Sequence, residues 1–167
     1  MTYVYYIVTT ITTFFAWAYI HEMAHVVAYK RTVGLSSYKL FLWPHIYDNH
    51  FYFARVMSTI SRQPTNSEQV KISLAPRYPD TVAVGALVLV SVLMPYSMLT
   101  SIIVIFLFGG ALDMFVGCLG TSSKSDLKIA LWPLPPNLRL VVLWLYRYLG
   151  LFVFVGGSAA GVYFFTK

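Results

Sequence analysis

Charged side chains and cysteines are both scarce in this chain. Only 11% of its 167 residues are charged, six residues are acidic, and Cys118 is the single cysteine. One cysteine excludes an internal disulfide and a cysteine-rich metal site, so any bound metal must be held by histidine and carboxylate side chains. The scarcity of charge, together with a hydrophobic content of 58% and a mean hydropathy of +0.67, excludes an ordinary soluble domain and indicates a membrane protein.

The basic residues outnumber the acidic ones and give a net charge of +6, but they form no continuous stripe. We therefore expect no nucleic-acid partner. The basic excess is better explained by loops that stay on the cytoplasmic side and by attraction to anionic lipid. The abundant tyrosine, phenylalanine and tryptophan residues suit the two interfaces of a bilayer.

Hydrophobic runs predict about four membrane-spanning helices in one integral membrane domain that covers residues 1–167. An α-helix needs about 20 apolar residues to cross the hydrocarbon layer. The second and third spans are separated only by a short uncharged turn at Pro95, which predicts an antiparallel hairpin. The expected spans are residues 3–29, 81–98, 100–119 and 140–165.

Residues 33–80 are more polar and predict a small β-sheet or hairpin at the membrane surface. The runs 38–43 and 50–56 are rich in β-forming residues, and 69–74 alternates polar and apolar side chains, as a half-buried strand does. An exposed strand edge there could align a substrate by strand addition.

The distribution of basic residues predicts the topology. The loops after the first and third spans carry Lys and Arg and are expected in the cytoplasm, with both termini outside. This pattern suits a multi-pass protein of the plasma membrane, and equally one of an organelle membrane. Residues 156–161 form a small-residue face that could pack helices closely, so a homo-oligomer is a further expectation.

The most informative stretch is His21-Glu22-Met23-Ala24-His25. Residues four apart lie on one face of a helix, so His21 and His25 should project side by side. Two neutral imidazoles at this spacing can hold one zinc ion, and the intervening Glu22 can activate water as a general base. An ionisable group in an apolar helix costs roughly 2.5 kcal/mol or more unless it is paired or metal-bound, so this setting favours a functional site.

A catalytic zinc ion usually has three protein ligands, which leaves one carboxylate to find. Asp48 and Glu68 lie in polar loops, and Asp80 at a span boundary is typical of a helix N-cap. Asp113 lies within the apolar third span, where burial favours function. Asp126 follows a polar segment and could equally be an N-cap. Charge and burial therefore favour Asp113.

Glycines near Asp113 are expected to weaken the third span. They lie at positions 109–110 and between 117 and 120. Unwound backbone is tolerated inside a membrane where protein or a cavity surrounds it.

The chain resembles the site-2 protease type of intramembrane zinc metalloprotease. The motif at 21–25, the predicted sheet after it and Ser73-Leu74-Ala75-Pro76 carry the resemblance. It is similar above all to a branch of small membrane zincin peptidases, which have a late Ser-x-x-Asp-Leu segment that corresponds to residues 123–127 here, with Ser125 in place of the usual glycine. This resemblance implies Asp126 as the third ligand, with Asp113 as the alternative.

The resulting hypothesis is a zinc endopeptidase that cleaves membrane-embedded or membrane-proximal peptide substrates. His45 and His50 could add ligands, but their spacing suits a surface turn. Three alternatives stay open: a non-proteolytic metal-binding protein for ion transport or sensing (or an inactive homologue), a membrane scaffold, and a zinc hydrolase that acts on lipid or another amide.

Overall fold

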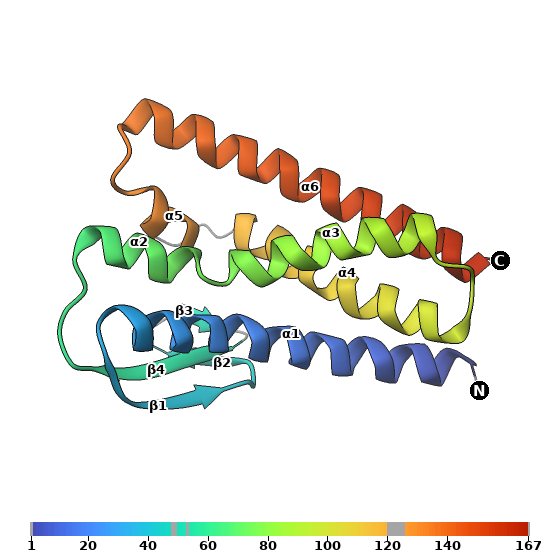
Figure 1. Cartoon of the computed structure of the whole chain (residues 1–167), viewed down its shortest axis with the longest axis horizontal. Coiled ribbons are helices and arrows are strands. Elements are labelled where there is room, and N and C mark those ends of the chain that lie inside the picture. Colours follow the sequence, from blue (N-terminus) through green and yellow to red (C-terminus); the bar gives the residue numbers. More distant parts are fainter. Residues whose placement is uncertain (1, 48–49, 53, 120–125, 167) are drawn as a thin grey trace.

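The computed structural model describes residues 2–47, 50–52, 54–119 and 126–166. The described chain is mainly helical, as predicted, with short strands after the first helix. Its long helices follow the long axis of the molecule, and α1 begins at the same end where α6 finishes (Figure 1). These long helices are α1 (Thr2–Thr32), α3 (Arg77–Leu93), α4 (Met98–Leu119) and α6 (Pro136–Thr166).

The strands form two small antiparallel pairs, which confirms the predicted β-region. β1 (Leu35–Phe41) pairs with β4 (Arg55–Ile60), and β2 (His45–Tyr47) pairs with β3 (His50–Tyr52). Gly34 connects α1 to β1 at a φ of 78°, a left-handed conformation that glycine adopts without strain.

The strands lie beside α1. The ring of Phe15 in α1 stacks on Trp43 at 5.8 Å between centroids, and β4 contacts the same helix. Figure 1 shows the strands beside the C-terminal part of α1, the part that carries the histidine pair.

The β-region is shorter than predicted, because residues 69–74 are helical and not a strand. They belong to α2 (Asn66–Leu74), which begins with a capping box in which Thr65 and Glu68 bond each other's backbone N–H groups. Ile72 and Ser73 are both buried, although they are adjacent, which a half-buried strand would not allow. The polar–apolar alternation was outweighed by the cap and by packing of α2 against α5 (Asp126–Leu131).

The helices α3 and α4 form the antiparallel hairpin that the sequence predicts, with the turn at Pro95 between them. Their shared core is built around Leu87, Val104 and Ala111. α3 begins before the predicted span, and Pro76 occupies its N-cap, so the prediction of an N-cap at Asp80 is wrong. Asp80 lies one turn later and pairs with Arg77.

The glycines of α4 do not unwind it, contrary to expectation, since the helix is continuous over Met98–Leu119. Gly109 and Gly110 instead admit the indole of Trp17 from α1, which would collide with any added Cβ. These two glycines therefore allow α1 and α4 to pack closely and do not interrupt α4. Gly120 and Thr121 lie outside the described residues.

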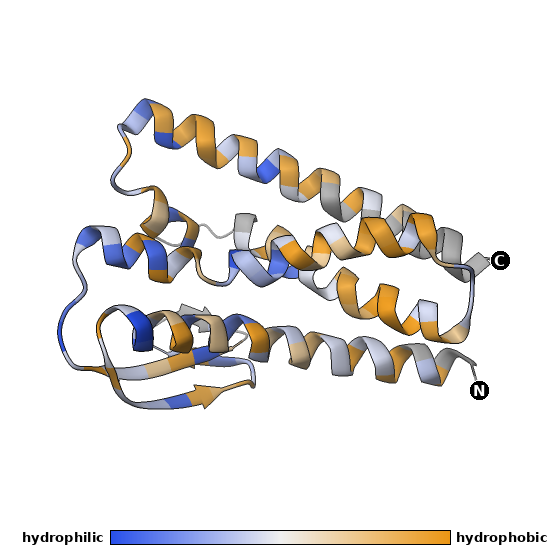
Figure 2. Cartoon of the chain, in the orientation of Figure 1, coloured by the Kyte–Doolittle hydropathy of each residue, from blue (hydrophilic) through white to orange (hydrophobic). Residues whose placement is uncertain are grey.

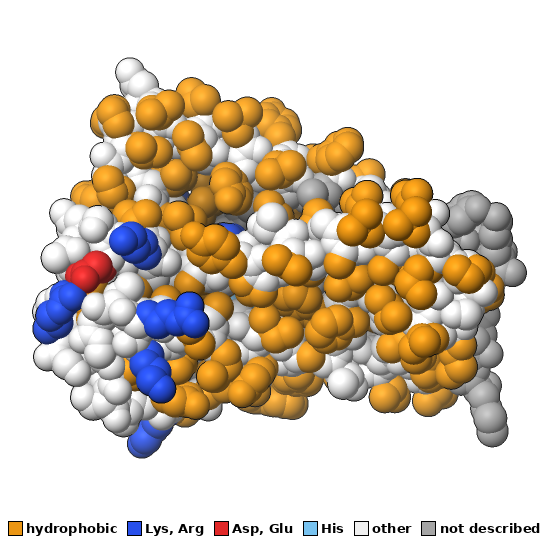
Figure 3. All heavy atoms as spheres, viewed as in Figure 1, with side chains coloured by type: hydrophobic (Ala, Val, Ile, Leu, Met, Phe, Trp, Pro, Cys, Tyr) orange, Lys and Arg blue, Asp and Glu red, His pale blue; other side chains and the backbone are white. Residues whose placement is uncertain are grey.

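The surface is apolar along most of the molecule. Figure 2 shows hydrophobic residues along α3, α4 and α6, with hydrophilic residues gathered around α2 and the C-terminal end of α1. On the face drawn in Figure 3, Lys and Arg side chains collect at that same end. Within the described residues, two helices are long and apolar enough to cross a membrane, Asn66–Leu93 and Met98–Gly117.

The small-residue face predicted at 156–161 lies in α6. A Cβ added at Gly156 would meet nothing within 4 Å, so this position is open for a neighbouring helix. The side chains of most of the other residues in the segment lie outside the described part of the chain.

Candidate metal centre

The motif His21-Glu22-Met23-Ala24-His25 lies on α1, as the spacing predicts. The two imidazole rings are one helical turn apart, with 5.3 Å between their centroids. Glu22 and His25 are buried, and His21 is largely shielded. The helix therefore presents both histidines on one protected face.

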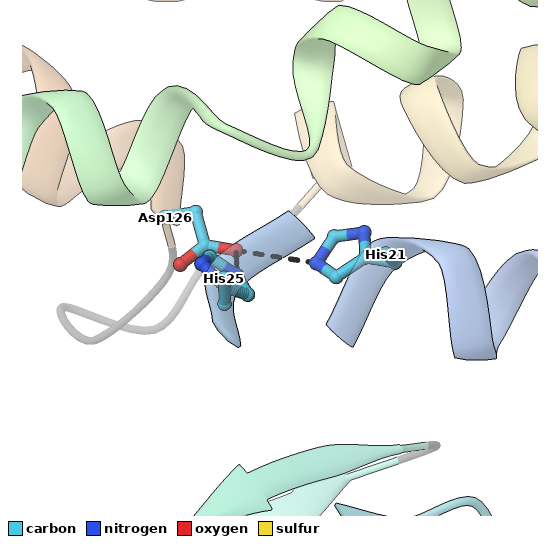
Figure 4. Close-up of side chains that lie close together, drawn as sticks. All are labelled: His21, His25 and Asp126. Carbon is cyan, nitrogen blue, oxygen red and sulfur yellow. Dashed lines mark hydrogen bonds and ion pairs between the residues drawn. The ribbon is translucent and has the colours of Figure 1, made fainter. Parts of the chain in front are cut away.

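Asp126 is the carboxylate that reaches this pair. It is the first residue of α5, and its Oδ2 lies 3.1 Å from His25 Nε2 and 3.4 Å from His21 Nε2. Figure 4 shows the two histidines on α1 with the Asp126 carboxylate turned towards both of them. One ligand atom from each residue falls within 4.8 Å of the others, so His21, His25 and Asp126 could hold a metal ion.

Asp113, the alternative third ligand, lies on the opposite nitrogen of His21. Its Oδ2 is 2.7 Å from Nδ1, whereas Nε2 faces Asp126. Among the described residues, the group that could hold a metal contains Asp126 and not Asp113. Both aspartates that the sequence singled out therefore contact the same histidine, on different sides of its ring.

The second histidine is oriented by a backbone carbonyl. His25 Nδ1 lies 3.0 Å from the oxygen of Ile72 in α2. In an unbroken helix this oxygen would accept a hydrogen bond from the N–H of residue 76, but residue 76 is proline and has none. Within the part of the chain that the structure describes, Ala75 N–H is the backbone donor to this carbonyl, at 3.2 Å. Pro76 thus leaves the Ile72 oxygen free to accept from His25.

These contacts fix where the histidine protons lie. Asp113 carboxylate and Ile72 carbonyl oxygens only accept, so each Nδ1 carries the proton and donates it. In a neutral imidazole the lone pair is then on Nε2. Without an ion, the Nε2 atoms can donate to the Asp126 carboxylate. With a divalent cation such as zinc, each Nε2 would instead supply a lone pair beside the carboxylate oxygen, and this donor set fits such an ion.

The electrostatics of Asp126 suit a ligand that stays ionised. Burial opposes ionisation of this carboxyl, but the hydrogen bonds to His21 and His25 outweigh it and lower the pKa of Asp126 below its ordinary value. Asp126 therefore offers an anionic oxygen to a cation at this position.

Glu22 lies next to the ligand pair but is not a member of the group. It is 8% exposed, and the backbone of Val56 in β4 lies beside its carboxylate. The contact between Val56 and Glu22 shows that the β1–β4 sheet lies next to the histidine pair. A buried carboxylate close to a metal position is the arrangement that a general base requires.

The remaining polar residues that the sequence raised lie elsewhere. His45 Nδ1 lies 2.8 Å from the carbonyl of Trp43, within the region of the β2–β3 pair, and does not join the metal group. His50 belongs to β3. Glu68 lies in the first turn of α2 and not in a loop, where it caps the helix and pairs with Arg62 at 2.6 Å. Asp48 and residues 123–125 lie outside the described residues.

The sequence analysis did not identify Ile72, Pro76 or Arg77 as contributors to the site. Ile72 and Pro76 act through the backbone, and the nearest sequence signal was the stretch at 73–76 that carries the family resemblance. Arg77 was counted only as a basic residue, yet it is buried between Asp80 and Asp113. The sequence carried no clear signal for Arg77, because it lies in the polar stretch before the predicted second span.

The fold and the site together define a mainly helical protein with two helices able to cross a membrane and a three-residue group able to hold a metal ion. Comparison with protein-family models, with curated proteins and with solved structures finds no match for this chain.

Proposed function

We propose that this protein is an intramembrane zinc endopeptidase. The observation that carries the proposal is the convergence of His21, His25 and Asp126, with Glu22 beside them. His-His-carboxylate is the ligand set of hydrolytic zinc sites, which leave a coordination position open for water. The resemblance of the motifs to site-2 proteases supports the same class.

Zinc at this site would act as a Lewis acid, polarising the scissile carbonyl and lowering the pKa of water toward about 7. Glu22 takes a proton from the attacking water as its oxygen bonds to the carbonyl carbon. It then gives that proton to the amine nitrogen as the C–N bond breaks. His21 and His25 would bind the ion through Nε2, while each Nδ1 faces an acceptor, Asp113 or the Ile72 carbonyl.

The proposal includes four membrane spans, formed by α1, α3, α4 and α6. Two observations support α1 and α6 as additional spans beside the two helices already found long and apolar enough to cross a membrane. α1 and α6 each contain 31 residues, and at 1.5 Å per residue either exceeds a hydrocarbon layer of about 30 Å. Both also expose large apolar side chains, such as Val4 at 66% and Phe152 at 77%.

The position of the site supports access from the cytoplasm. The histidine pair lies in the C-terminal half of α1, towards the end where Lys30 and Arg31 close the helix. The positive-inside rule places that end in the cytoplasm, most simply at the plasma membrane. Water could then reach a site that is otherwise within the membrane.

The substrate is proposed to be a transmembrane or membrane-proximal peptide segment. Such a segment must unwind before cleavage, because a helix keeps its amides hydrogen-bonded. β4 lies beside Glu22 and is the element closest to the site that could receive an extended chain.

The test is a comparison of wild type with Glu22→Gln in detergent or proteoliposomes. Gln cannot accept the proton of the water, so we expect zinc content to be unchanged and peptide cleavage to fall by at least about 100-fold. A Glu22→Gln protein should also retain substrate segments that the wild type releases. Unchanged cleavage in this variant would contradict the proposed mechanism. Metal-dependent transport that survives Glu22→Gln would favour a non-proteolytic metal-binding protein.

A further inference from the structure

The side of His21 that faces away from the metal position contacts a group of buried charges. His21 Nδ1 is 2.7 Å from Asp113 Oδ2. This hydrogen bond joins α1 to the middle of α4, across the helix interface. The metal hypothesis requires only Nε2 of His21, so Asp113 has no role in it as a ligand.

Arg77 holds Asp113 from the other side. Its Nη1 lies 3.4 Å from the backbone oxygen of Asp113 and 4.0 Å from its carboxylate. The same nitrogen donates to Asp80 at 2.7 Å. Arg77 is 8% exposed and Asp80 is 1% exposed, so this is a buried ion pair that contacts Asp113. A buried charge without a partner is strongly unfavourable, which fixes Arg77 where its acidic partners are.

The guanidinium of Arg77 is held against Gly117. A Cβ at position 117 would lie 2.6 Å from Nη2 and 2.8 Å from Cζ of Arg77. Gly117 is one turn after Asp113 on α4, so the two residues lie on the same face. The absence of a side chain at 117 therefore makes room for the arginine that contacts Asp113.

We propose that Asp113 is the positioning residue of His21, and that Arg77, seated against Gly117, keeps Asp113 in place. Asp113 accepts the Nδ1 proton and so directs the Nε2 lone pair at the metal position. Carboxylate partners of this kind orient the ring and raise its basicity as a ligand. The inference rests on the metal centre of the proposed function and adds a residue that acts through His21.

Asp113 thereby differs from Asp126 in its expected effect on metal binding. Loss of a ligand removes the site, whereas loss of an orienting partner weakens it by 10- to 100-fold. His25 needs no second carboxylate, because the Ile72 carbonyl serves its Nδ1.

The experiment measures zinc affinity by competition with a chromophoric chelator, using the full chain in detergent. Cobalt(II) absorption of the same samples reports the geometry and number of the ligands. The variants are Asp113→Ala, Asp113→Asn and Gly117→Ala, beside wild type. The matched control is Gly85→Ala, since a Cβ at Gly85 meets nothing within 4 Å.

We expect Asp113→Ala to bind zinc about 10- to 100-fold more weakly, with a cobalt spectrum of unchanged shape at saturation. Asp113→Asn keeps an oxygen that accepts from Nδ1 but loses the charge, so its affinity should lie between those of Asp113→Ala and wild type. Gly117→Ala should weaken binding by displacing Arg77. Gly85→Ala should bind as wild type does. A merely structural role for Asp113 would not produce this order.

Several results would overturn the inference. Wild-type zinc affinity in Asp113→Ala would remove the positioning role while leaving the zinc site in place. Complete loss of zinc with an altered cobalt spectrum in both Asp113 variants would make Asp113 a ligand. Equal affinity of Gly117→Ala and Gly85→Ala would remove Arg77 from the arrangement. Absence of zinc from the wild type would overturn the proposed function itself, so the two failures are distinguishable.

Discussion

Replacing Gly110 with alanine tests the close packing of α4 against α1 and α3. A Cβ at Gly110 would lie 2.6 Å from Ala83 Cβ and 2.7 Å from the Trp17 ring. Ordinary contact begins at 3.4 Å, so the shortest of these approaches is roughly 0.8 Å too close. Trp17 has little freedom to yield, because it is 5% exposed and its indole N–H donates to the Phe106 carbonyl of α4.

The expected magnitude follows from two opposing effects. Alanine favours a helix over glycine by about 1 kcal/mol, whereas overpacking a core costs about 1–3 kcal/mol. Gly85→Ala gains the first effect without the second, since its Cβ meets nothing within 4 Å. The difference in unfolding free energy between Gly110→Ala and Gly85→Ala should therefore be about 1–3 kcal/mol, with Gly110→Ala the less stable.

The same substitution should disturb the metal centre. Trp17 and His21 are four residues apart on α1, and Gly110 and Asp113 are three apart on α4, so the two contacts are successive layers of one interface. Thermal unfolding in detergent and zinc affinity should both be lower in Gly110→Ala. Equal unfolding temperatures for Gly110→Ala and Gly85→Ala would refute the claim that this interface is closely packed.

Two further predictions concern metal binding. Pro76→Ala restores an N–H that competes for the Ile72 oxygen, so His25 should be less well oriented and zinc affinity should fall, as chelator competition can measure. An unchanged affinity would show that the proline has no part in the site. Zinc removal by a chelator should lower the unfolding temperature of wild type and leave that of His21→Ala unaffected. Zinc at 100 times its Kd adds about 2.7 kcal/mol to the free energy of unfolding, and this contribution is lost on removal. An equal response of the two proteins would show that zinc does not bind at His21.

The helical half of the site could be predicted from the sequence. Spacing alone places His21 and His25 on one face of a helix with Glu22 between them, because the period of an α-helix is independent of what surrounds it. The α3–α4 hairpin was equally accessible, since two apolar runs separated by a short turn have few other arrangements.

The carboxylates could not be assigned from local pattern. Asp113 and Asp126 both contact His21, but through different nitrogens, and that difference depends on how α4 and α5 are placed against α1. Burial favoured Asp113 as the ligand because a buried carboxylate is usually functional. It did not distinguish a ligand from a residue that supports one.

The error at α2 has a local cause. The alternation over 69–74 suggested a strand, but Thr65 and Glu68 already had the spacing of a capping box. A short segment can satisfy both periods, and here the cap and the burial of Ile72 and Ser73 decided for a helix.

The central claim is tested most directly by the zinc content of the protein purified in detergent without chelators and with zinc supplied. We expect about one zinc ion per chain in wild type and none in His21→Ala or Asp126→Ala. Asp113→Ala should still fill at saturating zinc, because its role is to orient His21. A wild-type protein without zinc, or an Asp126→Ala protein that keeps it, would contradict the account.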